Sequence, residues 1–79
     1  MSELERIGKF LSVVKETPSR SRWRPLWRLI NNGREMLGVI RWYSNWKEYI
    51  FQPYEGSEYS VECLADIKAF LDKCNAEAK

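Results

Sequence analysis

The sequence predicts an α+β fold with an N-terminal helix, a three-stranded antiparallel β-meander and a C-terminal amphipathic helix packed on the sheet. Apolar residues recur every three or four positions near both ends of the chain, as they do on one face of a helix. The middle holds three runs rich in aromatic and β-branched residues, which favour strands. An Asn-Gly pair divides the first two runs and is a strong hairpin signal. The 79 residues suit a single domain, 1–79.

The first element is expected to be a helix over 3–16. Its apolar residues would share one helical face, with spacings of three and four: Leu4, Ile7, Leu11 and Val14. Gly8 weakens a helix by about 1 kcal/mol relative to alanine. Thr17 should end the helix, because the residue before a proline avoids the α region. The helix is expected to cover the sheet or a second copy of the chain.

Three strands are expected next, over 22–30, 36–43 and 47–53. Asn32-Gly33 predicts a type I′ turn between the first two, and Ser44-Asn45 is expected to turn the second pair. Two-residue turns fix which residues lie opposite each other, and opposite residues share a face. In this register Gly38 would lie between Trp27 and Phe51. One face of the sheet would be apolar, with the side chains of Trp23, Pro25, Trp27, Leu29, Met36, Ile40, Trp42, Tyr49 and Phe51.

The other face of this predicted sheet is mixed, and it holds the basic residues. It contains Arg24, Leu26, Arg28, Ile30, Leu37, Val39, Arg41, Glu48, Ile50 and Gln52. Arg24 would lie opposite Arg41, and like charges facing each other are destabilising. Glu48, on the third strand, would offset the charge of Arg41. Arg24 and Arg28 would have no evident internal partner. That placement favours an external partner for this face.

The last element is expected to be a helix over 61–76, with Ser60 as its N-cap. Its stripe would cover the apolar face: Leu64, Ile67, Leu71, Cys74 and Ala78, widened by Cys63 and Phe70. Cys63 and Cys74 would lie about 16 Å apart on this helix. A disulfide needs Cα atoms within about 7 Å, so both cysteines are expected to be free thiols. Free thiols are typical of a reducing compartment.

Charge is unevenly spread along the chain. Residues 1–47 hold ten Lys and Arg against four Glu, whereas residues 48–79 hold three Lys against seven Asp and Glu. This asymmetry suggests a nucleic acid or an acidic partner for the first half. Complementarity between the sheet and the last helix is the alternative.

Catalysis is not expected, so no residue is assigned a catalytic, cofactor-binding or metal-binding role. The chain has no histidine to serve as a general base. Its four glycines are scattered, so no phosphate-binding loop is formed. The carboxylates of Glu55, Glu58, Glu62 and Asp66 match no metal-binding loop, and acids near a helix N-terminus are favoured by its dipole.

Binding of a macromolecule is the expected function, with a protein as the leading partner class. Arginine beside apolar surface, with aromatic residues at the rim, is a mixture that interfaces enrich. The expected partner-binding residues are Arg24, Arg28, Arg41, Tyr43 and Trp46. The alternative is a nucleic acid held by the 20–28 segment, through Arg20, Arg22, Arg24 and Arg28. A homodimer is left open, and no membrane contact is expected.

A specific pattern of apolar and aromatic residues runs through Leu37-Gly38-Val39-Ile40-Arg41-Trp42-Tyr43, through Trp46-Lys47-Glu48-Tyr49-Ile50-Phe51-Gln52-Pro53, and through the stretch from Cys63 to Leu71. In this pattern the chain resembles a group of small bacteriophage and prophage proteins of unassigned function. The resemblance covers about half the chain, roughly 37–71. It implies a shared fold, a mobile-element origin and the cytoplasm of a bacterial host, and it brings no catalytic or ligand residues. An acidic start, without the basic residues of a signal peptide, also favours the cytoplasm.

Overall fold

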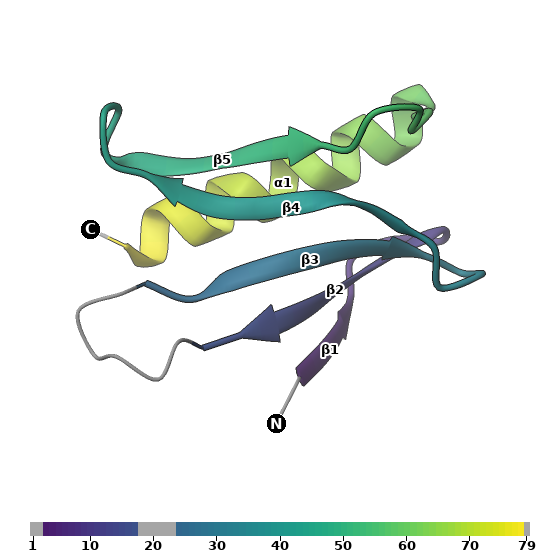
Figure 1. The fold of residues 1–79 in the computed structure, drawn as a ribbon, viewed down its shortest axis with the longest axis horizontal. Helices are drawn as coiled ribbons and strands as arrows, with labels where there is room; N and C mark the ends of the chain where they lie inside the picture. The colour runs from purple at the N-terminus through teal and green to yellow at the C-terminus, as the bar shows by residue number, and fades with distance from the viewer. Residues whose placement is uncertain (1–2, 18–23, 79) are drawn as a thin grey trace.

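The computed structural model describes residues 3–17 and 24–78, which form a five-stranded antiparallel sheet with a helix along one face (Figure 1). The strands follow chain order across the sheet. They are β1 (Glu3–Arg6), β2 (Leu11–Glu16), β3 (Leu26–Asn31), β4 (Met36–Tyr43) and β5 (Glu48–Pro53), and the helix is α1 (Val61–Glu77). β1 and β5 are the two edges, and α1 runs along the side of the sheet formed by β4 and β5. No helix in the described ranges is long and apolar enough to cross a membrane.

The predicted fold is wrong at the N-terminus, where the helix expected over 3–16 is the hairpin β1–β2, and the sheet therefore has five strands. The segment also contains a two-residue period: Leu11 and Val13 point inward and are at most 1% exposed, whereas Val14 lies on the other face. A helix would leave the edge of β3 unpaired. The hairpin pairs that edge with β2 and buries Leu11 and Val13, so tertiary pairing overrides the helical spacing.

The middle strands are close to the predicted ones. The expected 36–43 coincides with β4, and 47–53 begins one residue before β5. β3 starts only at Leu26, after Pro25, and the first two residues of the expected 22–30 lie outside the described ranges.

The predicted type I′ turn at Asn32-Gly33 is wrong. Asn31 accepts a hydrogen bond from the Arg34 amide at 3.0 Å, and it is Arg34, at φ 64°, that adopts the left-handed conformation. The loop therefore has three residues, which shifts the pairing by one. A bulge beside Leu29 shifts it by one more, so Leu29 lies opposite Gly38 rather than Met36. Because two shifts of one residue restore the parity, Trp27, Leu29 and Ile40 keep their predicted face.

The second turn is also longer than predicted, because Ser44 to Lys47 all lie between the strands. Tyr49 lies opposite Trp42, and Arg41 lies opposite Ile50 instead of Glu48. This two-residue shift again preserves the faces.

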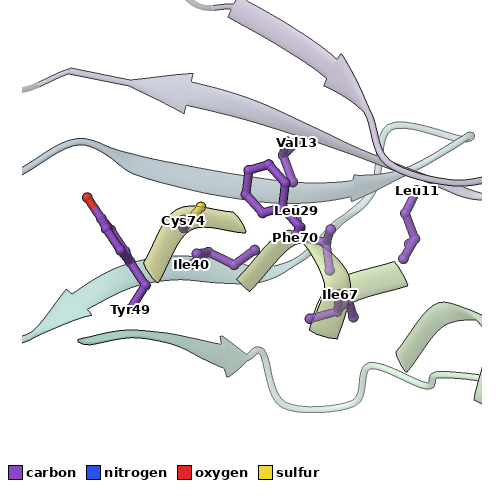
Figure 2. Close-up of a cluster of buried hydrophobic side chains, with 8 residues drawn as sticks. All are labelled: Leu11, Val13, Leu29, Ile40, Tyr49, Ile67, Phe70 and Cys74. Carbon is purple, nitrogen blue, oxygen red and sulfur yellow. The ribbon is translucent and has the colours of Figure 1, made fainter. Parts of the chain in front are cut away.

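The core lies between the sheet and α1, as Figure 2 shows. It is formed by one apolar cluster from four strands and the helix: Leu11, Val13, Leu29, Ile40, Tyr49, Ile67, Phe70 and Cys74. Trp27 contacts Tyr49 and Phe70 edge to face, at centroid distances of 5.4 Å. The prediction of an aromatic-rich core under the C-terminal helix is confirmed in this respect.

The C-terminal helix is confirmed, and α1 ends one residue beyond the expected 61–76. The Ser60 side chain accepts a hydrogen bond from the Cys63 amide at 3.2 Å, as an N-cap does. Cys63 and Cys74 are free, as predicted, and Cys74 is buried. Burial raises the pKa of the Cys74 thiol to about 11, so this thiol stays protonated at neutral pH.

Candidate functional site

The candidate site is the face of the sheet that points away from α1, called the open face below. Strand alternation and the observed register place seven apolar or aromatic residues and two arginines on it: Leu4, Val14, Leu26, Arg28, Ile30, Val39, Arg41, Tyr43 and Ile50. Most of these side chains are half-buried by their neighbours, and Leu4 is 64% exposed. The same register places Arg6, Glu16 and Glu48 on this face as well. The open face therefore combines an apolar area with charged residues, among them Arg28 and Arg41.

Arg28 lies between Val14 and Val39 on the neighbouring strands. Its Nε donates a hydrogen bond to the Glu16 carboxylate at 2.7 Å, and its guanidinium donates a longer one of 3.4 Å to the Tyr54 hydroxyl. The bond to Glu16 raises the pKa of Arg28 further above its ordinary value. The expectation that Arg28 lacks an internal partner is wrong, because the hairpin brings Glu16 beside it.

Arg41 lies one strand away and is held differently. Its Nε donates to the Gln52 amide oxygen at 2.8 Å, and its guanidinium lies 5.7 Å from the centre of the Tyr43 ring. No carboxylate of the described residues forms a salt bridge with Arg41, because the predicted pairing with Glu48 is replaced by Ile50. Arg41 therefore contributes a fixed positive charge to the open face that no neighbouring carboxylate neutralises.

Tyr43 and Trp46 form an aromatic pair at the β4–β5 end of the open face. Their rings meet edge to face at 4.9 Å, and Trp46 is 65% exposed. The Asn45 side-chain amide donates to the Tyr43 hydroxyl at 3.1 Å, which holds the ring from the turn. The structure therefore brings Tyr43 and Trp46 together, and Trp46 is the larger exposed anchor.

Arg24 does not join the other arginines. It precedes β3, and its guanidinium lies 3.9 Å above the Trp42 ring, which belongs to the face that α1 covers. The predicted placement of Arg24 opposite Arg41 on the open face is wrong, because β3 starts at Leu26, two residues after Arg24, so Arg24 is not part of the strand. Of the nucleic-acid alternative, Arg20 and Arg22 lie outside the described residues, as does Trp23.

Sequence reasoning missed the part of this surface that the N-terminal hairpin supplies. Leu4 and Val14 extend the apolar area, and Glu16 fixes Arg28. A strand was indicated by the run Leu11-Ser12-Val13-Val14-Lys15, in which buried residues alternate with less buried ones and two β-branched valines are adjacent. That run fits a strand at least as well as a helix.

Comparison with known proteins gives no match among protein families, curated proteins or solved structures. Within residues 3–17 and 24–78, no three His, Cys, Asp or Glu side chains are grouped as a metal-binding site would require.

Proposed function

We propose that the chain is a non-catalytic accessory protein of phage or prophage origin that binds another protein, from the host or the phage, through the open face. The observation that carries the proposal is the composition of this face. An apolar centre that includes Leu26, Val39 and Ile50 surrounds Arg41, and an exposed Trp46 lies at one end. Aromatic residues and arginine are enriched in protein interfaces, and a few such residues carry most of the binding energy. The phage origin follows only from the resemblance of 37–71.

The test uses the full chain as bait in a lysate of a host bacterium. Trp46→Ala and Arg41→Ala should each reduce capture of a specific protein by about thirtyfold or more, as loss of an interface hot spot does. Both side chains lie outside the core, so melting temperatures should hardly change. Glu62→Ala is the control, because Glu62 is exposed in the first turn of α1 and does not belong to the open face. Equal capture by all variants would remove the open face as the site.

Nucleic-acid binding is separated from protein binding by two further arms of the same experiment. Nuclease treatment should leave protein capture intact. Affinity for phosphate groups would fall steeply as salt rises, because bound counterions are released. An interface led by Trp46 should lose little affinity over the same range of salt. Capture that disappears with nuclease would favour the nucleic-acid alternative.

A further inference from the structure

The apolar stripe of α1 is wider than the sheet beneath it covers. Ile67, Phe70 and Cys74 are at most 5% exposed and form the buried seam. Leu64 is 51% exposed, and Leu71, two turns further along, is half-buried. Leu64 and Leu71 therefore form an apolar flank that the sheet leaves uncovered.

This flank faces the edge strand β5 and forms one wall of a groove of about 460 Å³. The other wall is β5 itself, from Glu48 to Phe51. The groove differs from the open face, which lies on the far side of the sheet, so either surface can be occupied without the other. It resembles the surroundings of a missing strand, with a sheet edge on one side and a helix below.

The edge of β5 carries backbone groups that point away from β4. The Tyr49 amide donates to the Asn75 side-chain oxygen at 2.6 Å, and the Asn75 side-chain nitrogen donates to the Tyr49 carbonyl at 3.4 Å. Asn75 thus imitates a neighbouring strand at Tyr49. Because backbone groups alternate along a strand, the amide and carbonyl of Phe51 point the same way. Neither is matched by a partner within the described residues.

The lining of the groove carries two carboxylates and one lysine: Glu48, Asp72 and Lys68. Lys68 is paired with Asp72 at 2.7 Å. Glu48 forms no salt bridge with a cation of the described residues. A carboxylate without a cation beside it favours a basic occupant.

We infer that the groove between β5 and α1 binds an extended, basic peptide segment of another protein, which adds a strand to the edge of β5 at Phe51. Strand addition supplies affinity through backbone hydrogen bonds and specificity through pockets for alternate side chains. The added strand is antiparallel to β5, so the peptide residue that bonds to Phe51 lies directly opposite it and shares its face, and its side chain lies on Leu64 and Leu71. The residues on either side point away from α1, and there a lysine or arginine can approach Glu48.

A second copy of the chain is a poorer occupant of this edge. Two antiparallel β5 strands that paired at Phe51 would place Tyr49 of one copy opposite Pro53 of the other. Pro53 has no amide to donate, and Asn75 already occupies Tyr49. Natural edge strands use proline and side-chain cover to avoid pairing with each other.

The test uses the full chain and a capped peptide of about six residues, the length of a typical strand, in which valine alternates with lysine. Binding is measured by fluorescence anisotropy, and its position by amide hydrogen exchange. Exchange at the Phe51 amide should slow when the peptide binds. N-methylation of the valines removes the amides that would bond to Phe51 and should weaken binding about tenfold or more. N-methylation of the lysines alters amides that point away and should change binding little.

Matched protein variants separate the groove from the open face. Leu64→Ser should weaken peptide binding, whereas Leu4→Ser, a similarly exposed leucine on the open face, should not. Absence of peptide binding, equal effects of the two methylated peptides, or unchanged exchange at Phe51 would each overturn the inference. A concentration-dependent dimer that protects Phe51 would also overturn it and would assign the edge to a second copy. Capture through the open face is measured with Trp46→Ala, so failure of one surface is distinguishable from failure of the other.

Discussion

Gly38→Ala should destabilise the protein, although alanine is normally better than glycine within a strand. A β-carbon at position 38 would lie 2.6 Å from the Gln52 carbonyl oxygen and 2.7 Å from the Phe51 ring. Ordinary contacts start at 3.4 Å, so the neighbouring strand would have to move by roughly 0.8 Å. Phe51 can tilt its ring, but the Gln52 oxygen belongs to the backbone of β5 and cannot rotate away.

The expected magnitude follows from two opposing effects. Overpacking of this kind costs about 1–3 kcal/mol, and contact with backbone places Gly38→Ala near the upper limit. Alanine in a strand recovers about 0.5–1 kcal/mol relative to glycine. The net loss in unfolding free energy is therefore about 2 kcal/mol, which lowers the melting temperature of a domain this size by about 8–16 °C.

The assay is a pair of thermal melts followed by circular dichroism, with Gly33→Ala as the control. A β-carbon at position 33 would meet the side-chain oxygens of Asn31 and Glu35 at 3.4 and 3.9 Å, which are ordinary contacts, so that variant should melt within a few degrees of the wild type. An unchanged or higher melting temperature for Gly38→Ala would show that β4 and β5 do not approach as described. The position of Gly38 beneath the Phe51 ring would then be wrong.

Four further outcomes are expected. A thiol reagent at about pH 8 should modify Cys63 before Cys74, because Cys74 is 4% exposed and burial raises its pKa to about 11. Because the pKa of Cys74 is raised on folding, its contribution to stability is complete below pH 9.0, the ordinary pKa of the thiol, and is lost as the pH rises through about 11. In urea melts between these two pH values, the unfolding free energy of the wild type should therefore fall more than that of Cys74→Ala. Glu16→Gln should change the unfolding free energy by less than about 1 kcal/mol, because the pair with Arg28 is partly exposed, and a larger loss in urea melts would contradict this. Asn75→Ala should cost about 1–2 kcal/mol and speed exchange at the Tyr49 amide, whereas Asn45→Ala, in an exposed turn, should leave that amide unchanged.

The strands of the middle segment could be predicted because their signals are local. Strand β4 contains Val39, Ile40, Trp42 and Tyr43, which favour strands. The faces are preserved because the total register shift is two residues in each hairpin. In the first hairpin the longer loop and the bulge contribute one residue each, and in the second the longer turn contributes both. The turn types themselves could not be predicted. Asn-Gly favours a two-residue loop. Two features favour a three-residue loop instead: the bulge beside Leu29, and the Asn31 side chain, which accepts a hydrogen bond from the Glu35 amide at 2.9 Å.

The N-terminal hairpin could not be predicted from the segment alone. Leu4, Ile7, Leu11 and Val14 fit a helical face, and an isolated helix of about 14 residues is marginal in water, so tertiary contacts decide the outcome. The decisive contact is with β3, whose edge needs a partner. The consequences for the site are direct: Arg28 is paired with Glu16, and the open face is extended by Val14.

Among the described residues, salt bridges do not neutralise the opposite net charges of the two halves of the chain. Three salt bridges join described residues, and one of them, Lys73 with Glu5, connects the acidic half to the basic half. In that bridge the lysine comes from the acidic half and the glutamate from the basic half. It therefore neutralises no part of the excess negative charge of the acidic half or of the excess positive charge of the basic half. The excess charges, such as Arg41 and Glu48, are thus left without carboxylate or cation partners among the described residues. Internal complementarity between sheet and helix therefore does not explain the pattern. Arg41 and Glu48 instead remain available to groups of opposite charge outside the chain.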